Sequence, residues 1–237
     1  SKVLYILWKG IKTMQRIIFA TGNAGKIREI KMILENLKVN GEAAEVISMK
    51  EAGILVEVEE DGKSFVENAV IKAKAVAKEA QGAIVMADDS GLEIDYLNKE
   101  PGIYSARYMG ENTSYHVKNK KLIERLLGVP EEKRSARFVC AIACVLPDGR
   151  VLTEEAAVEG RIGHEERGEN GFGYDPIFMI PAYGKSTAEL SEAEKNEISH
   201  RGRALRAMRV QLENLSEVRD EKTDGIRGSF YENTDCQ

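Results

Sequence analysis

A short apolar run that leads into two aspartates constrains this chain more than any other feature. Residues 84–87 are Ile, Val, Met and Ala, and Asp88, Asp89, Ser90 and Gly91 follow directly. Such a run predicts a strand buried on both faces, and Asp, Ser and Gly favour a turn at its end. Open α/β sheets place ligands at the carboxyl ends of strands. The carboxylates are therefore candidates for a Mg²⁺ site or a general base, with an acidic turn as the alternative.

A second strand signal leads into a glycine-containing turn and a helix. Residues 15–20 predict a strand, T-G-N-A-G-K follows, and apolar residues then recur at helical spacing from Ile27 to Leu37. A helix that begins at such a turn directs backbone N–H groups and its positive end at one point, which suits a phosphate. The spacing of a Walker A loop is absent, and a plain strand-to-helix turn is the alternative. The candidate phosphate-binding residues are Thr21, Gly22, Asn23, Ala24, Gly25 and Lys26.

The rest of the chain alternates strand and helix signals, which predicts an α/β fold. Ser64 is the expected N-cap of a helix, with Glu67 as its capping-box partner. Capping and catalysis are both open roles for Glu67 and Asn68, and the acidic residues at 59–62 predict a surface turn. We expect further strands at 46–58, 137–146 and 151–158, a loop at 160–171, and helices at 112–127 and from Ser199 onward.

Two later stretches contribute candidate site residues. Phe172 lies between two glycines, which would let its ring stand beside a ligand, although a buried core aromatic is the alternative. Lys195 precedes the last helix. His200 and Arg201 follow Ser199 and should lie at the positive end of that helix, where a lone His is more often structural than functional.

Composition limits the partners and the compartment. The formal net charge of -5 argues against a nucleic-acid polymer as the partner. The 3 cysteines form no C-x-x-C motif, and Cys140 and Cys144 are expected to be small buried residues, so the cytoplasm fits best. No apolar run is long enough to span a membrane.

The two ends of the chain differ in pattern from its middle. Residues 1–13 are expected to be an N-terminal extension or a cloning remnant, because a cleaner strand pattern begins at Met14. Residues 216–237 are polar without periodicity and predict a mobile tail. One domain is therefore expected over residues 14–215.

Several motifs together resemble one family. The chain is similar to the inosine/xanthosine triphosphate pyrophosphatases, the HAM1-like family that acts on non-canonical purine nucleotides. The matching motifs occur in the family's order, and they are T-G-N-A-G-K at 21–26, F-V-E-N-A at 65–69, A-D-D-S-G at 87–91, P-G-I-Y-S-A-R-Y at 101–108, G-F-G-Y-D-P-I-F at 171–178 and E-K-N-E-I-S-H-R at 194–201.

The resemblance implies a long mixed β-sheet with flanking helices, two lobes around an active-site cleft, and a homodimer. It implies Mg²⁺-dependent hydrolysis of ITP, dITP and XTP to the monophosphate and pyrophosphate, which would cleanse the nucleotide pool. It also implies that Asp89 is the general base or a metal ligand and that Glu60 is a second metal ligand. Substrate contacts would come from residues 21–26 and from Ser90, Phe172, Gly173, Tyr174, Asp175, Lys195, His200 and Arg201.

Two other functions remain open at this point. A phosphatase could form an aspartyl-phosphate on Asp88 or Asp89, although that chemistry ordinarily uses a D-x-D pattern and these acids are adjacent. A nucleotide-binding regulator without turnover is the other alternative.

Overall fold

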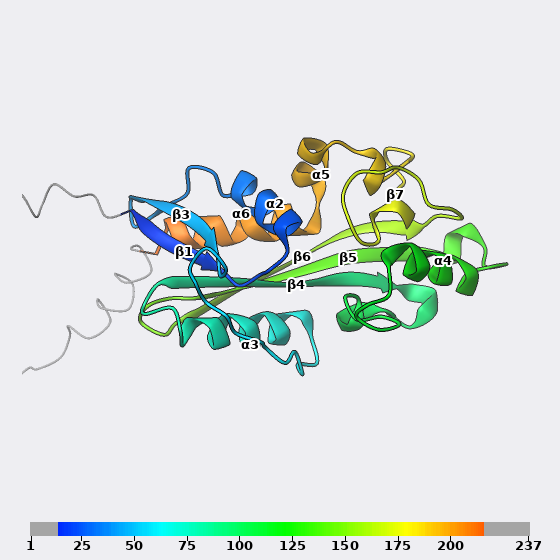
Figure 1. Ribbon diagram of the computed structural model, residues 1–237. Helices are drawn as coiled ribbons and strands as arrows, with labels where there is room; N and C mark the ends of the chain where they lie inside the picture. The colour runs from blue at the N-terminus through cyan, green and yellow to red at the C-terminus, as the bar shows by residue number, and fades with distance from the viewer. Residues whose placement is uncertain (1–13, 216–237) are drawn as a thin grey trace, which may run out of the picture.

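A long mixed sheet with helices on both faces forms the fold (Figure 1), in a computed structural model that describes residues 14–215. The strands are β1 Gln15–Phe19, β2 Lys38–Val39, β3 Glu42–Ser48, β4 Ile84–Ile94, β5 Ser135–Val145, β6 Val151–Ile162, β7 Phe178–Ile180 and β8 Lys185–Ser186. They form an 8-stranded sheet in the order β2-β3-β1-β4-β5-β6-β7-β8. β1 pairs in parallel with β3 and β4, and the other pairs are antiparallel. The predicted mixed α/β sheet is confirmed.

The helices cover the sheet from both sides. Within residues 14–215 they are α2 Ala24–Ile33, α3 Phe65–Ala77, α4 Tyr115–Arg125, α5 Glu192–Ile198 and α6 His200–Glu213. α3 lies on one face of the sheet, and α2 and α6 lie on the other (Figure 1). α4 lies near the far end of the long strands, away from β1 and β3.

Each face of β4 packs into its own apolar cluster. Val85 and Ala87 contact the α3 side, where Ala69 and Ala73 are fully buried. Met86 contacts the opposite side, in a cluster with the buried residues of α2 and α6. This alternation follows from the two-residue period of a strand. Cys140 and Cys144 are buried and free, as predicted.

β4 does not end at the aspartates, as the sequence predicted. It continues to Ile94, because β5 pairs with it through the acidic stretch, with Asp88 opposite Ile142 and Asp89 opposite Ala141. β1, in contrast, pairs with β4 only as far as Met86. The two aspartates therefore lie in mid-strand, just past the carboxyl end of β1.

Other element boundaries also differ from the predictions. α2 ends at Ile33, with Leu34 as its C-cap, rather than at Leu37. β6 extends into the predicted 160–171 loop because β5 and β7 pair with it as far as Ile162. In the predicted 46–58 strand region, β3 ends at Ser48 and no strand follows up to residue 58.

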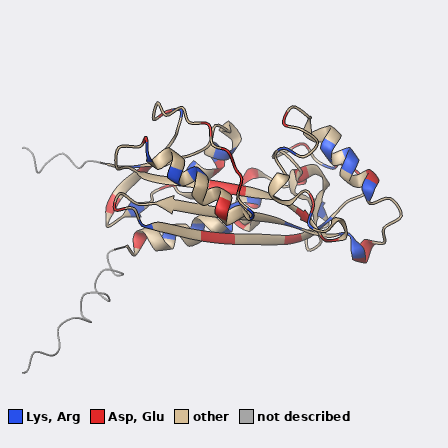
Figure 2. Ribbon diagram, turned by 90° about the horizontal axis from the view of Figure 1, so that it is seen from below, with Lys and Arg blue, Asp and Glu red and all other residues tan. Residues whose placement is uncertain are grey.

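The expectations for the two ends of the chain concern residues 1–13 and 216–237, which lie outside the described residues. Within residues 14–215, no helix is both long and apolar enough to cross a membrane. Acidic and basic segments are interspersed along the molecule in the view of Figure 2, with no single basic face in that view.

Candidate active site

Two adjacent carboxylates of β4 project to opposite faces of the sheet. Neighbouring residues of a strand alternate in direction, so Asp88 faces α2 and α6, whereas Asp89 faces α3. The contacts agree: the Asp88 carboxylate meets Lys26 and Arg201, and the Asp89 carboxylate meets Asn68. One strand thus carries two acids into different surroundings.

Asp88 is held as an anion by cations. Its Oδ2 lies 3.0 Å from Lys26 Nζ and 3.3 Å from Arg201 Nε. Burial opposes ionisation, but the charges of Lys26 and Arg201 outweigh it and hold the pKa of Asp88 below its ordinary value. This carboxylate is already paired, which suits a structural role better than proton transfer.

Asp89 lies in surroundings that favour proton transfer. Burial is the largest cause of a pKa raised to about 6, and the charge of Glu60 acts in the same direction. Lys72 and the Asn68 amide oppose that rise. Asn68 Nδ2 donates to Asp89 Oδ2 at 3.0 Å, and the Ser90 N–H donates to Oδ1 at 3.0 Å. A carboxylate with a pKa near 6 and a fixed orientation suits a general base.

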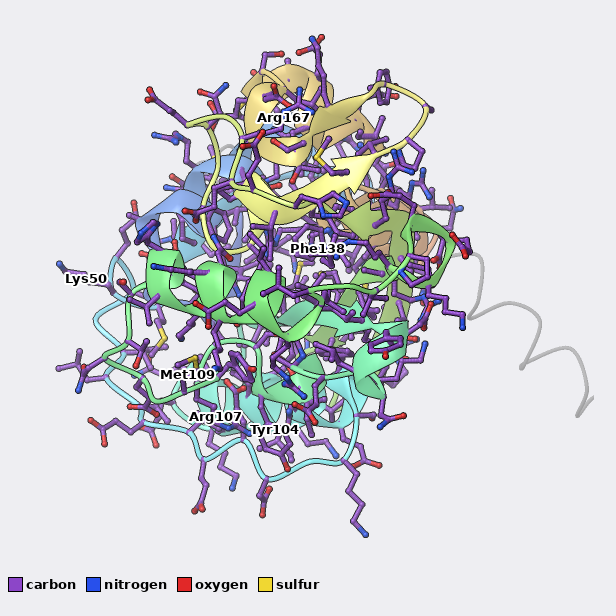
Figure 3. The ribbon with its side chains drawn as sticks, turned by 90° about the vertical axis from the view of Figure 1, so that its right-hand side faces the viewer. Lys50, Tyr104, Arg107, Met109, Phe138 and Arg167 are labelled. Atoms are coloured by element: carbon purple, nitrogen blue, oxygen red, sulfur yellow. The ribbon has the colours of Figure 1, made fainter. Side chains whose placement is uncertain are left out.

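Glu60 lies on the same side, on an irregular segment ahead of α3. Lys72 Nζ contacts Glu60 Oε1 at 2.7 Å and donates to the backbone oxygen of Asp88 at 3.0 Å. Arg107 donates to the Glu60 carbonyl at 3.0 Å, and its guanidinium lies 5.0 Å from the centre of the Tyr104 ring. Figure 3 labels Arg107 and Tyr104 next to each other. Lys72 therefore connects the Glu60 segment to β4.

The phosphate-type turn precedes α2, as predicted. Asn23 is the N-cap of that helix, and its Oδ1 accepts from the Lys26 N–H at 3.1 Å. Thr21 Oγ1 accepts from the Asn23 N–H at 3.1 Å. The turn is thus fixed by its own side chains, and Lys26 in the first turn of α2 reaches Asp88.

Phe172 is partly exposed rather than buried in the core. The residue is 38% exposed, with Lys195 Nζ 4.9 Å and the Arg201 guanidinium 5.6 Å from the centre of its ring. Gly171 and Gly173 on either side have φ of +76° and +72°, a conformation that favours glycine. Phe172 is therefore not the buried core aromatic of the alternative interpretation, and its contact with a ligand stays a prediction.

The side chains of two residues close to Phe172 in sequence form hydrogen bonds within the protein. Asp175 Oδ2 accepts from the Phe172 N–H at 2.8 Å and from Lys195 Nζ at 2.7 Å. The Tyr174 hydroxyl donates to the carbonyl of Ser105 at 2.7 Å, and its side chain is buried. The side chains of Tyr174 and Asp175 therefore hold the loop, and their contact with substrate stays a prediction.

His200 is buried at the start of α6. Its ring is buried and stacked on Phe138 at 4.9 Å; Figure 3 shows Phe138 in the middle of the molecule. Burial, followed by the charges of Arg201 and Lys195, lowers the pKa of His200 well below its ordinary value. The ring is therefore neutral and donates from one nitrogen only.

Arg201 is more strongly engaged than its sequence position indicates. Its NH1 contacts Glu29 Oε2 at 2.5 Å, and its NH2 donates to Ser90 Oγ at 3.1 Å. Together with the Asp88 contact, every nitrogen of the guanidinium already has a partner. Arg201 orders the junction of α2, β4 and α6, and its direct contact with a base stays a prediction.

A cleft joins the phosphate turn to the aromatic loop. It has a volume of about 590 Å³, which is within the range of ligand sites. Its walls come from the start of α2, the Phe172 loop and α5, and include Asn23, Gly25, Phe172 and Lys195. A second hollow of about 770 Å³ lies beside Glu60 and Arg107. Asp88 and Asp89 line neither of these two hollows; they are contacted instead by Lys26, Arg201 and Asn68, which come from distant parts of the sequence.

The sequence analysis did not assign Lys72 and Glu29 to the site and left the role of Asn68 open. Asn68 and Lys72 are four residues apart and so share one helix face. Polar residues on the buried side of an otherwise apolar helix are the signal that could have identified them. Glu29 is buried in α2 although it follows the basic Lys26 and Arg28, and sequence alone offers no signal for its pairing with Arg201.

Comparison with known proteins agrees with this architecture. The chain matches the Ham1 family over residues 17–211. It is 48% identical over 200 residues to a dITP/XTP pyrophosphatase of Bacillus licheniformis, covering 84% of this chain and 99% of that protein. A dITP/XTP pyrophosphatase of Clostridium perfringens is 45% identical over 207 residues, covering 85% and 99%. The solved structure of the Staphylococcus aureus Ham1 protein has a TM-score of 0.74 and 42% identity, covering 85% of this chain and 100% of that one.

The fold and the site define an α/β protein with a cleft between a helix start and an aromatic loop, and with two adjacent carboxylates on a central strand. The family match covers most of the chain, and the chain belongs to the Ham1 family.

Proposed function

We propose that this protein hydrolyses deaminated purine nucleoside triphosphates, namely dITP, ITP and XTP, to the monophosphate and pyrophosphate. The observation that carries the proposal is Asp89: a buried carboxylate with a pKa raised to about 6 by burial and by the charge of Glu60, on the strand where the preceding Asp88 contacts Lys26 at the start of α2. The names of the relatives support the substrate class.

Mg²⁺ is proposed as the cofactor, and the donor set is consistent with it. Within residues 14–215, no group of three or more His, Cys, Asp or Glu side chains could hold a metal ion. Mg²⁺ commonly binds through one or two carboxylates, substrate phosphates and water, so a two-carboxylate site is sufficient. Glu60 and Asp89 would hold the ion, which would neutralise charge on the phosphate oxygens.

The proposed reaction is attack of water on the α-phosphorus. Asp89 accepts a proton from that water as the new P–O bond forms, and the bond between the α-phosphorus and the bridging oxygen breaks. Pyrophosphate leaves with the electrons of that bond. Lys26 and the first N–H groups of α2 stabilise the charge that develops on the phosphate oxygens, which is the main requirement of phosphoryl transfer.

The base is proposed to lie over Phe172, in the cleft with Lys195. A carbonyl oxygen at C6 of hypoxanthine or xanthine accepts hydrogen bonds, whereas the amino group of adenine donates them. Lys195, the single donor of neutral His200 and the backbone N–H groups at 173–174 all favour an acceptor at that position. A site built from such donors rejects a donor base, because its own buried groups then lose their partners.

A nucleotide panel with Mg²⁺ tests this function. We expect pyrophosphate, not orthophosphate, from dITP and XTP, with ATP much slower. In ¹⁸O-labelled water, the label should appear in the monophosphate. Label in pyrophosphate would place the attack at the wrong phosphorus, and orthophosphate from a monophosphate would favour the aspartyl-phosphate alternative. Binding of dITP without any turnover would indicate a regulator.

A homodimer in the cytoplasm is also proposed, on the basis of the family resemblance and the cysteine pattern. Light scattering coupled to size exclusion measures the mass directly. A mass near that of one 26.3 kDa chain would contradict the dimer.

A further inference from the structure

Asn68 connects the two segments that carry the candidate metal carboxylates. It lies on α3, fully buried, with 0% of its surface exposed. Its Nδ2 donates to Asp89 Oδ2 at 3.0 Å, and its Oδ1 accepts from the Gly62 N–H at 2.8 Å. Gly62 is two residues after Glu60, so a single amide connects the Glu60 segment to the base on β4.

The direction of this amide is determined by its partners. The Gly62 N–H can only donate, so the oxygen of the Asn68 side chain must face it, and the NH₂ group must then face Asp89. A Leu, Ala or Asp side chain would lack one or both functions. Asn is also a poor residue for a helix interior, so helix propensity does not account for its presence in α3.

The Gly62 backbone has come unusually close to this amide. A Cβ built at Gly62 would lie 2.6 Å from Asn68 Oδ1 and 2.8 Å from Glu67 Cβ, closer than real side chains approach. Glycine is required here by that close approach. The acidic segment is thus packed directly against Asn68, and the contact involves more than one hydrogen bond.

We propose that Asn68 is a positioning residue that sets the distance and orientation of Asp89 relative to the Glu60 segment. Neither contact of Asn68 involves substrate, so its effect acts through these two carboxylates. The expected change in kcat rests on the proposed function, whereas the link between Asn68 and the Gly62 segment does not. Partners that orient ligands in this way commonly change metal affinity or activity by about 10–100-fold when removed.

Three variants separate positioning from folding. Asn68→Ala removes both contacts. Asn68→Asp keeps an acceptor for Gly62 but places an oxygen against the Asp89 carboxylate. Ser64→Ala is the matched control, because Ser64 caps the same helix by accepting from the Glu67 N–H at 3.1 Å and contacts neither Asp89 nor Gly62. It should lower the melting temperature by a few degrees, because the helix loses its cap, without changing kcat.

The kinetic test measures kcat and KM for dITP. We expect both Asn68 variants to lower kcat by about 10–100-fold and to change KM by less than about threefold. Equilibrium binding of Mn²⁺ together with the α,β-imido analogue of dITP, followed by electron paramagnetic resonance, should weaken for Asn68→Ala by a similar factor. Ser64→Ala should match the wild type in kcat, KM and Mn²⁺ binding.

Amide hydrogen exchange of Gly62, measured by NMR without metal or nucleotide, tests the structural link. Protection should be lost in Asn68→Ala and retained in Asn68→Asp and Ser64→Ala. Folded Asn68 variants with kcat and Mn²⁺ affinity within about twofold of the control would overturn the proposal, as would loss of the fold in both variants. If the wild type fails to hydrolyse dITP, the proposed function is wrong, and the exchange and Mn²⁺ data still decide the role of Asn68.

Discussion

The two faces of β4 give adjacent aspartates opposite chemical character. On the face covered by α2 and α6, Asp88 is paired with Lys26 and Arg201, and its pKa is held below its ordinary value. On the α3 face, Asp89 has an amide and a nearby carboxylate as neighbours, and its pKa is raised to about 6. Both aspartates lie on the same strand, so the difference between their pKa values comes from the side chains that surround them on each face.

This comparison indicates a division of labour between the faces. The α2 and α6 face carries Lys26 and Arg201, and Arg201 also contacts the ring of Phe172, so this face is suited to binding phosphates and base. The α3 face carries Asp89, Glu60 and Asn68, and is suited to activating water. Changes on the α3 face should therefore lower kcat, and changes on the other face should weaken binding.

The largest expected effect is that of Asp89→Asn. The amide cannot accept the proton of the attacking water, so kcat for dITP should fall by about 10²-fold or more, in the range found for general bases. Steady-state kinetics with Mg²⁺ in excess measures it. Asp88→Asn is the control on the other face and should lower kcat far less. Similar losses in both variants would contradict the division between faces.

Wild-type activity should also depend on the ionisation of Asp89. The carboxylate is the active form, so kcat/KM should rise as pH increases and level off above about 6, the value to which the pKa of Asp89 is raised. A cation bound at Asp89 can only lower its pKa, and so can only move this rise of kcat/KM to lower pH. The residual activity of Asp89→Asn should not show this rise with pH.

The next effect is that of Lys26→Ala. A charge-assisted hydrogen bond to phosphate contributes roughly 1.5–3 kcal/mol, so kcat/KM should fall by roughly 10–100-fold. The phosphates are common to all substrates, and dITP and ATP hydrolysis should therefore decline by similar factors. A variant that altered only the preference between these bases would place Lys26 at the base instead.

The sequence predicted most of the elements because their signals are local. The T-G-N-A-G-K turn, the Ser64 cap and the alternation of apolar residues each act within a few residues, and the structure contains all of them. The end of the central strand was predicted wrongly, since D-D-S-G favours a turn locally. The ladder with β5, a contact distant in sequence, overrides that preference.

The sequence indicated which residues belong to the site better than it indicated their charge states and contacts. The strand period could have placed Asp88 and Asp89 on opposite faces, but only once the strand was known to continue through them. The neutral state of His200 depends on its burial against Phe138, and the Arg201–Glu29 pair joins residues 172 positions apart. Such contacts are set by how helices pack and leave no local pattern.

A smaller effect is expected for Phe172→Ala. Stacking of a base on an aromatic ring contributes about 1–3 kcal/mol, and adenine and hypoxanthine offer similar ring faces. The KM values for dITP and ATP should therefore rise together by about 5–50-fold, with kcat less affected. The ratio of the two kcat/KM values should stay within about threefold of the wild-type ratio. Collapse of that ratio would make Phe172 the residue that selects the base.

The smallest effect concerns stability. As pH rises, the contribution of Asp89 to the free energy of unfolding should decrease and that of Asp88 should increase. The folded pKa of Asp89 lies above the ordinary value of 3.8, so its contribution is most favourable below about pH 4 and declines as pH rises to about 6. The folded pKa of Asp88 lies below its ordinary value. Its contribution is present above about pH 4 and is lost as the pH falls below that.

Thermal unfolding of the two Asn variants in EDTA tests this difference. At pH 7.5, Asp89→Asn removes a buried charge that is costly to ionise but also loses a hydrogen bond, so it should gain about 1–2 kcal/mol of unfolding free energy. Asp88→Asn leaves Lys26 and Arg201 short of a counter-charge and should lose roughly 1–3 kcal/mol of unfolding free energy, with Glu29 limiting the loss.

For a chain of this size each kcal/mol corresponds to about 2–4 °C in Tm, so Asp89→Asn should melt above the wild type and Asp88→Asn below it. At about pH 4 the two melting temperatures should approach each other. If both variants melt below the wild type at pH 7.5, burial of Asp89 does not strain the fold, and the contrast between the faces is limited to catalysis.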